Sequence, residues 1–430
     1  MTSSSITIVN STKYRVDGEA GRYTFETHQV IEGKNVVHDT SHDCFKPLKN
    51  GRDHYHTVGF KEIALLGGCV DDSYRKTSDR LNRVRCQPSA TPFRTLHDVA
   101  EAEGLKLQAH LTEFSRGIFE KIGFDKYTGV PPPEFKVKEP LTRLPAQSVA
   151  DVVGNMDVSA EWRMAMLENI VPYEDKDAST CVSVDDVCVK RQKESRDEGG
   201  QEYETGQEKV RKTVRNTVVH IGQGGKSYLL NGPTIEVTLR FTLAFLIVNG
   251  LLTDNIIFFV DGERSLRNGI VDCFKWHNKT MIILDWHHLG KKCSEYLSMA
   301  LKGSKIRNNV LEKLKPLLWH GLLDKAIEYL KSLDASIIKD QSYVEKLIGY
   351  FERNRGNIPC YSVRQALGLR NSSNRVEKAN DLLVAERQKN NGMSWSESGS
   401  VALASLNGLR FNGEANEWFE YESIRFKMAA

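Results

Sequence analysis

The chain has 430 residues, of which 40% are hydrophobic, 27% charged and 9% aromatic. This composition is ordinary for a globular protein and excludes wholesale disorder, a collagen-like repeat and a coiled-coil rod. The formal net charge is only +3, so any surface that binds nucleic acid must be a local basic patch. The length predicts about three folding units.

Neither a membrane span nor an export signal is expected. The longest apolar runs, residues 241–248 and 256–260, fall well short of the roughly 20 residues that cross a bilayer. The first 15 residues lack the charged and then apolar pattern of a signal peptide. The eight cysteines include no CxxC pair, which argues against a zinc ribbon and a disulfide framework. We therefore expect a cytoplasmic protein with no membrane partner.

The first 130 residues change from a β-rich or irregular segment, residues 1–60, to a helical region, residues 61–130. Short helices are expected at 61–66 and 73–84, before prolines interrupt the pattern. Apolar spacing then predicts two amphipathic helices, 95–103 and 107–122, joined by a tight turn at Gly104. The pair could be an ordinary helical hairpin or a DNA-binding helix-turn-helix. In the second case the polar side would carry Arg94, Lys106 and Arg116.

Residues 131–177 are expected to form a linker, stiffened by the prolines at 131–133, 140 and 145 and followed by a lead-in helix at 160–169. Beyond it the pattern becomes α/β. The highly charged segment 190–208 is expected to be an exposed loop. The predicted strands are 181–189, 214–221, 227–230, 255–260 and 281–284, with helices at 234–249 and 265–274.

This order of elements predicts an RNase H-like domain built from residues 178–290 and 360–420, with a helical insertion at 291–359. The run Gly224-Gly-Lys-Ser ends like a phosphate-binding loop. However, the leading glycine of that motif is replaced by His220, and a strand follows instead of a helix. We expect a hairpin turn there.

Three carboxylates lie where metal-dependent phosphodiester chemistry would need them. Asp185 lies within the first strand, Asp261 follows the apolar run 256–260, and Glu377 lies in a predicted helix at 374–388. Three acids brought together repel one another unless cations neutralise them. Mg²⁺ binds such hard oxygen ligands, and two ions support in-line attack on a phosphodiester. Asp261 could instead cap the next helix, and Glu377 could lie on a solvated face.

The C-terminal residues resemble the signature of bacterial insertion-sequence DDE transposases. In that family the third acid is followed by Arg-x-Lys and then by Gly-Met-x-Trp-Ser. The matching residues here are Glu377, Arg387, Lys389, Gly392, Met393, Trp395 and Ser396. Asp261-Gly262 resembles the element that holds the second acid, and Asp185 matches the first. Asp186 is a departure, because the family commonly has glycine there, and it leaves open which of the two aspartates binds metal.

Asp285-Trp-His-His288 resembles a motif of the wider Mutator-like transposase group. The resemblance implies that Asp285 and His288 lie near the active site without belonging to the triad. A helix cap at Asp285 with packed histidines is the alternative. Arg387, Lys389 and Trp395 would position DNA, although Trp395 could equally be a core residue that holds the last helix.

The resemblance implies a DNA transposase with an RNase H-like domain and Mg²⁺ as its cofactor, most simply as two ions that Mn²⁺ can replace. The enzyme would cleave transposon ends and join the freed 3′-hydroxyl to target DNA. Its partners would be double-stranded DNA and further copies of the chain, in the bacterial cytoplasm and at the nucleoid. The basic residues that would hold the DNA backbone are Lys291, Lys292, Lys302, Lys305, Arg307, Arg370, Arg375, Lys378, Arg387 and Lys389.

Two other functions remain open at this stage. A decayed or domesticated transposase would bind DNA without cutting it, although this chain keeps all three acids. A stand-alone RNase H-like nuclease would use the same acids to hydrolyse strands without joining them.

Overall fold

The structure is a computed structural model that describes residues 6–32, 35–39, 54–70, 73–137, 143–193, 212–389 and 392–428. The chain folds into two compact units. The first contains residues 1–108, 189–214 and 383–425, and the second contains residues 109–188, 215–382 and 426–430. Most of the predicted loop at 190–208 and Pro140 lie outside the described residues.

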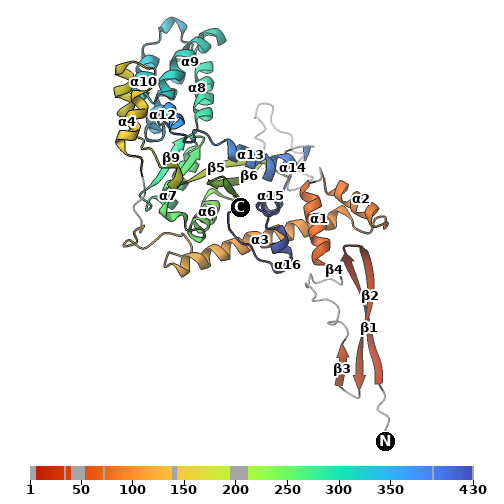
Figure 1. The fold of residues 1–430 in the computed structure, drawn as a ribbon. Coiled ribbons are helices and arrows are strands. Elements are labelled where there is room, and N and C mark those ends of the chain that lie inside the picture. The colour runs from red at the N-terminus through yellow and green to blue at the C-terminus, as the bar shows by residue number, and fades with distance from the viewer. Residues whose placement is uncertain are drawn as a thin grey trace. The chain divides into compact units, whose positions relative to one another are not determined.

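The first unit begins with a four-stranded sheet of order β3-β2-β1-β4 (Figure 1). β1 (Ile6–Gly18) and β2 (Gly21–Glu32) form a long antiparallel ribbon, β3 (Asn35–Asp39) pairs with β2, and the short β4 (His54–His56) runs parallel to β1. At the end of the ribbon, the buried carboxylate of Asp17 accepts hydrogen bonds of 2.9 and 3.1 Å from Arg22. The β-rich prediction for the N-terminal segment is confirmed.

The predicted turn at Gly104 is wrong. After α1 (Val58–Val70) and α2 (Tyr74–Val84), the chain forms one continuous helix, α3 (Phe93–Lys121). Gly104 instead allows close packing against α15 (Glu397–Asn412), because a Cβ at this position would come within 2.5 Å of the Ala402 side chain and carbonyl oxygen. The absence of a side chain therefore serves a helix contact, and there is no helix-turn-helix at this position.

The second unit contains a five-stranded sheet of order β7-β6-β5-β8-β9 (Figure 1). β5 runs parallel to β8, β8 runs parallel to β9, and β6 is antiparallel to β7. All six residues of β8 are buried, as the uninterrupted apolar run predicts for a central parallel strand. The strand bounds are Ser179–Lys190 for β5, Thr213–Gln223 for β6, Lys226–Gly232 for β7, Asn255–Val260 for β8 and Thr280–Leu284 for β9.

The predicted hairpin turn between β6 and β7 is confirmed. Gln223 pairs with Lys226, so Gly224 and Gly225 form a two-residue loop, and both have positive φ angles, of 54° and 84°. Glycine is the residue that such a tight turn favours. The strand β7 follows the turn directly in place of a helix, so the segment does not form a phosphate-binding loop.

Helices α6 (Ile235–Val248) and α7 (Arg264–Phe274) confirm the two helices predicted in this part of the chain, and α5 (Ala160–Leu167) confirms the lead-in helix. Thr234 caps α6, since its hydroxyl accepts the backbone N–H of Val237. A further helix, α4 (Ala146–Gly154), lies in the segment predicted to be a linker. Short 3₁₀ turns are found at Lys176–Ala178, Leu251–Thr253, Ala335–Ile337 and Arg355–Asn357.

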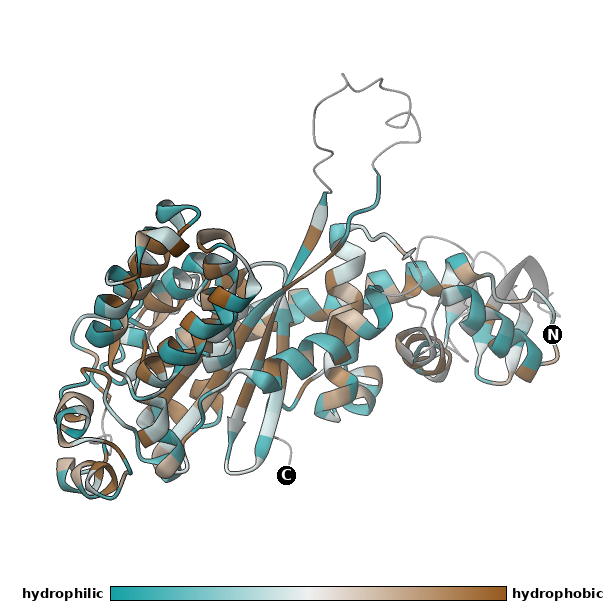
Figure 2. Cartoon of the chain, turned by 90° about the horizontal axis from the view of Figure 1, so that it is seen from above, coloured by the Kyte–Doolittle hydropathy of each residue, from teal (hydrophilic) through white to brown (hydrophobic). Residues whose placement is uncertain are grey.

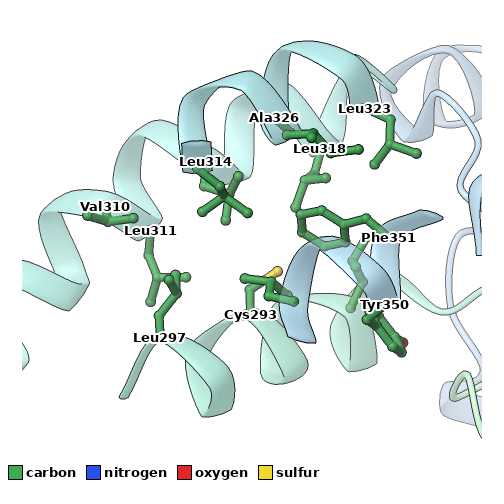
Figure 3. Packing of buried hydrophobic residues seen from close by; sticks show 14 of the residues in the cluster. Cys293, Leu297, Val310, Leu311, Leu314, Leu318, Leu323, Ala326, Tyr350 and Phe351 are labelled. Atoms are coloured by element: carbon green, nitrogen blue, oxygen red, sulfur yellow. The ribbon is translucent and has the colours of Figure 1, made fainter. Parts of the chain in front are cut away.

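The predicted helical insertion forms a bundle with its own hydrophobic core (Figure 3). Leu297, Leu314, Leu347 and Phe351 are fully buried in it. In Figure 2 the helices are striped with hydrophobic and hydrophilic residues, as expected of amphipathic helices. The helices of this region are α8 (Trp286–Ala300), α9 (Ser304–Trp319), α10 (Leu323–Lys331), α11 (Gln341–Arg353) and α12 (Tyr361–Ala366).

The helix predicted at 374–388 is present but irregular. It consists of α13 (Asn374–Asn380), a π-helical turn (Asp381–Ala385) and α14 (Glu386–Gln388), and the boundary between the two units falls within the π-helical turn. The last helix is α16 (Ala415–Tyr421). These elements confirm the α/β class.

Among the described residues, no helix combines the length and the apolar character that a membrane crossing requires.

Candidate active site

Three aspartates of the second unit lie at the same level of the parallel strands. Ser183 of β5 pairs with Phe259 of β8. Asp185 and Asp261 each lie two residues farther along the chain, Asp185 within β5 and Asp261 directly after β8. Val260 of β8 pairs with Leu284 of β9, and Asp261 and Asp285 are the residues that follow this pair. The carboxyl ends of parallel strands are where α/β folds place their sites. The strand register thus brings the three acids to one edge of the sheet.

Asp185 is held by two hydrogen bonds. Its Oδ1 accepts the backbone N–H of Asp186 at 2.8 Å, and its Oδ2 accepts the side-chain amide of Asn380 at 2.6 Å. Burial raises the pKa of Asp185 to about 6, and the negative charge of Asp261 adds to this rise. A carboxylate in this position is therefore costly to ionise without a nearby cation.

Asp186 has different partners from Asp185. It accepts a hydrogen bond of 2.6 Å from the hydroxyl of Thr217 and one of 3.0 Å from the guanidinium of Arg215. Burial raises its pKa, while Thr217 and Arg215 act in the opposite direction. Since Arg215 already supplies a positive charge to Asp186, Asp185 is the stronger candidate for a metal ligand.

Asp261 is partly exposed where β8 ends. Its Oδ1 accepts the backbone N–H of Glu263 at 2.8 Å, which closes a tight turn. The N-cap of α7 is Glu263, so Asp261 does not cap that helix. Gly262 makes the turn with a φ of +88°, a conformation that glycine adopts readily.

Asp285 is the N-cap of α8 and its side chain is only 1% exposed. Its two oxygens accept hydrogen bonds from the backbone N–H groups and the side chains of both His288 and Ser373. Burial alone would raise the pKa of Asp285, but the bonds from His288 and Ser373 outweigh it and lower the pKa below its usual value. The helix-cap interpretation of Asp285 is confirmed.

His288 connects this buried aspartate to the other acids. Its Nδ1 lies 3.1 Å from Asp285, and its Nε2 lies 3.9 Å from a carboxylate oxygen of Glu377 on α13. The hydrogen bond with Asp285 raises the pKa of His288 despite its burial, and the charges of Asp261 and Glu377 act in the same direction. The side chain of Glu377 is 47% exposed, so water screens its part of this interaction.

Within the described part of the chain, no three His, Cys, Asp or Glu side chains are placed so that they could jointly hold a metal ion. One observation nevertheless fits a cation. The Oδ1 of Asn380 is buried and has no hydrogen-bond partner among the described residues, and the amide nitrogen of the same side chain holds Asp185. Mg²⁺ binds hard oxygen atoms of this kind, including amide carbonyls and carboxylates.

Residues 239–423 match the model of a family described as an uncharacterised protein family, UPF0236. The match covers less than half of the chain, and it includes Asp261, Asp285, His288 and Glu377 but not Asp185. No curated protein and no solved structure matches the chain. This region is therefore similar to a family for which no activity is stated.

The other predicted site residues belong to the first unit. Arg387 is buried, donates to the carbonyl oxygen of Gly68 at 2.9 Å, and has the rings of Tyr74 and Trp395 5.1 and 5.3 Å from its guanidinium carbon. Trp395 is 6% exposed and donates from Nε1 to the carbonyl oxygen of Gln388 at 3.0 Å. Both side chains thus have structural roles. Lys389 is exposed.

Sequence reasoning missed Asn380, although a signal was available. It follows Glu377 by three residues, a spacing that places two helical side chains on the same face. Its partner Asp185 is almost 200 residues away, so its role could be recognised only once the strands and α13 were placed.

Proposed function

We propose that this chain is a DDE-type DNA transposase, which cleaves DNA at transposon ends with divalent cations and joins the freed 3′-hydroxyl to target DNA. The observation that carries the proposal is the strand register that aligns Asp185 with Asp261, together with His288, which contacts Glu377. These are the three acids that the resemblance to DDE transposases selects.

The sheet also supports this proposal. Its order, β7-β6-β5-β8-β9, has three consecutive strands on one side and two strands parallel to β5 on the other. An RNase H-like fold would have this arrangement, with its first acid on the central strand β5. We therefore include an RNase H-like fold of the second unit in the proposal.

In this proposal Asp185, Asp261 and Glu377 are the residues that would hold Mg²⁺, and they would have to move closer together than they lie in this structure to share the ion. Bound there, the cation would offset their mutual repulsion and polarise the phosphate that is attacked. Asn380 fixes the orientation of Asp185 through its amide. Asp285 fixes the ring of His288, and the raised pKa of His288 favours an imidazolium that can donate to the carboxylate of Glu377.

The test uses the full chain and a supercoiled plasmid that carries the gene with its flanking DNA. We expect nicking that requires Mg²⁺ or Mn²⁺, and Asp261→Asn or Glu377→Gln should slow it by about 10³-fold, which corresponds to about 4 kcal/mol. DNA binding should change little. Matched controls are Asp151→Asn and Glu345→Gln, because both residues are exposed on helices of the same unit and line neither of the hollows near Asp261. Unchanged nicking rates in the two active-site variants would contradict the proposal.

Joined products separate a transposase from a stand-alone nuclease. Water and a 3′-hydroxyl can attack with the same acids, so the nicking rate alone does not distinguish the two reactions. The assay therefore also includes a second, unrelated plasmid as target. Covalent transfer of the element into that target supports transposition, whereas hydrolysed ends without joined products would favour the nuclease.

A further inference from the structure

A hollow of about 520 Å³ borders Asp261 in the second unit. It is formed where the start of α7, the middle of α8 and the end of α11 meet, so the helical insertion supplies part of its wall. Asp261, Gly262 and Tyr350 line it together with basic residues. The site described above uses none of these basic side chains.

The hollow has an excess of positive charge. Its basic residues are Arg264, Arg267, Lys292 and Arg353, against the acids Asp261 and Glu263. Glu263 has a cation of its own, since it lies 3.7 Å from Arg215. Arg267 is held in place by a hydrogen bond of 2.8 Å from its guanidinium to the backbone carbonyl oxygen of Arg353. Lys292 is already paired with Glu295 at 3.0 Å, so Arg264, Arg267 and Arg353 are the cations that face the two acids.

Tyr350 lines this hollow, and its hydroxyl has a hydrogen bond to give. Its side chain is 5% exposed, and its oxygen is buried without a hydrogen-bond partner in the described residues. Figure 3 shows its ring at the edge of the insertion core, with the hydroxyl directed away from the other labelled side chains. Gly262 leaves room for this hydroxyl, because a Cβ at position 262 would overlap it. A buried hydroxyl without a partner costs about 1–3 kcal/mol, which a ligand oxygen would recover.

A second hollow, of about 490 Å³, continues from the first. It shares Arg267 and Arg353 with the first hollow and is also lined by Asn268, Asn357 and the acid Asp272. The two arginines therefore lie at the junction of a track that leads away from Asp261. A ligand that extends beyond the first hollow would meet them next.

We propose that the hollow beside Asp261 binds a backbone phosphate of the DNA strand, next to the bond that is cut. The hydroxyl of Tyr350 donates to a phosphate oxygen, and Arg267 and Arg353 neutralise the charge and guide the strand into the second hollow. Guanidinium groups match the geometry of phosphate oxygens. The identity of the ligand as DNA rests on the proposed function.

The first test measures binding of duplex DNA by fluorescence anisotropy over a range of salt concentrations, in EDTA so that no cleavage occurs. Each lost phosphate contact reduces the slope of log K against log salt by about 0.9. Arg267→Gln with Arg353→Gln should therefore reduce the slope by about 2. The charge-matched control is Lys313→Gln with Lys331→Gln, because both lysines are exposed on the insertion and line neither hollow. The control should keep the slope of the wild type.

Tyr350→Phe is the second test, since it removes only the hydroxyl. Binding should weaken by about tenfold or more, as loss of one hydrogen bond to a charged group predicts. The melting temperature should stay the same or rise, because this hydroxyl has no partner within the described structure. Weaker binding therefore cannot be attributed to unfolding.

Wild-type affinity and salt slope in both the arginine pair and Tyr350→Phe would overturn the inference. It would also be overturned if inorganic phosphate raised the melting temperature of the wild type but not of Tyr350→Phe, while both bound DNA equally, because the hollow would then hold a free anion. A wild type that binds DNA without cleaving it contradicts only the proposed function. A wild type that does not bind DNA contradicts both proposals.

Discussion

Asp261 and Asp285 follow neighbouring parallel strands in the same way, yet their side chains have different environments. Each comes directly after an apolar strand, and the residues before them, Val260 and Leu284, are paired in the sheet. Asp285 is buried, and its oxygens accept bonds from both His288 and Ser373. Asp261 is partly exposed, bonds the backbone of Glu263 and borders a hollow. A strand-end aspartate can therefore be structural or available for a ligand.

The residue that follows each aspartate explains the difference. Trp286 is already helical, so Asp285 becomes the N-cap of α8 and its carboxylate is used for that purpose. Gly262 makes a turn with positive φ instead, and α7 begins only at Arg264. This delay leaves the carboxylate of Asp261 outside the helix, where it can face a cation or a substrate.

The largest expected effect is a difference in the free energy of unfolding between variants of these two aspartates. Asp285→Ala should lower the free energy of unfolding by about 3 kcal/mol, because α8 loses its cap and the buried N–H of Ser373 loses its acceptor. Asp261→Ala is the matched control and should change it by less than about 0.5 kcal/mol. Urea denaturation of both variants measures the difference. Equal losses would contradict the distinction between the two aspartates.

The turn at Gly262 provides the next test. Gly262→Ala should cost about 2 kcal/mol, because alanine disfavours a φ of +88° and its Cβ would overlap the hydroxyl of Tyr350. Adding Tyr350→Phe should recover about 1 kcal/mol, because it removes the closest overlap but neither the 2.9 Å approach to Leu284 nor the backbone strain. Thermal unfolding of the two single variants and the double variant measures this coupling. Strictly additive losses would show that the hydroxyl does not limit space at position 262.

Asp185→Asn should have a smaller and opposite effect, a gain of about 1 kcal/mol at pH 7.5 without divalent cations. The folded-state pKa of Asp185 is raised from 3.8 to about 6. The favourable contribution of Asp185 to the free energy of unfolding is therefore complete below about pH 4, and it is lost as the pH rises through 6. The new amide can donate to the Oδ1 of Asn380, which has no partner within the described part of the chain, once the Asn380 side chain flips.

The free energy of unfolding is measured against pH for the wild type and for Asp185→Asn. The difference between the two curves isolates the titration of Asp185. His220, whose pKa burial lowers to about 4, titrates in the same range but is common to both proteins. Mg²⁺ should raise the melting temperature of the wild type and not that of the variant. A variant less stable than the wild type at pH 7.5 would contradict the cost assigned to the ionised carboxylate.

Much of the sheet could be predicted because its signals are local. The apolar run of β8 and the two glycines of the β6–β7 turn are each encoded within a few residues. Gly104 shows the limit, because the same residue type suits a turn or a close helix contact. Only the position of Ala402 distinguishes the two.

The same limit applies to the candidate site, where some residues could be predicted from the sequence and others could not. The aspartates could be found from the sequence because they lie within or directly after strands that the apolar pattern predicts. The roles of Asn380 and Tyr350 depend on contacts with distant parts of the chain. Arg387 and Trp395 carry part of the resemblance to transposases, yet both side chains are buried. A motif can therefore include residues that hold the fold as well as residues that face a substrate.

The smallest expected effect is a shift in the pKa of His288. It tests the comparison between Asp261 and Asp285, since this imidazole interacts with both aspartates. The hydrogen bond and charge of Asp285 raise its pKa most, and Asp261 and Glu377 contribute smaller amounts in that order. NMR titration of the ring should therefore show the largest fall in pKa with Asp285→Asn, a smaller fall with Asp261→Asn and the smallest with Glu377→Gln. Because Glu377 is half-exposed, Glu377→Gln should also change the free energy of unfolding by less than about 0.5 kcal/mol. A larger fall with Asp261→Asn than with Asp285→Asn would mean that His288 belongs with the exposed acids and not with the buried cap.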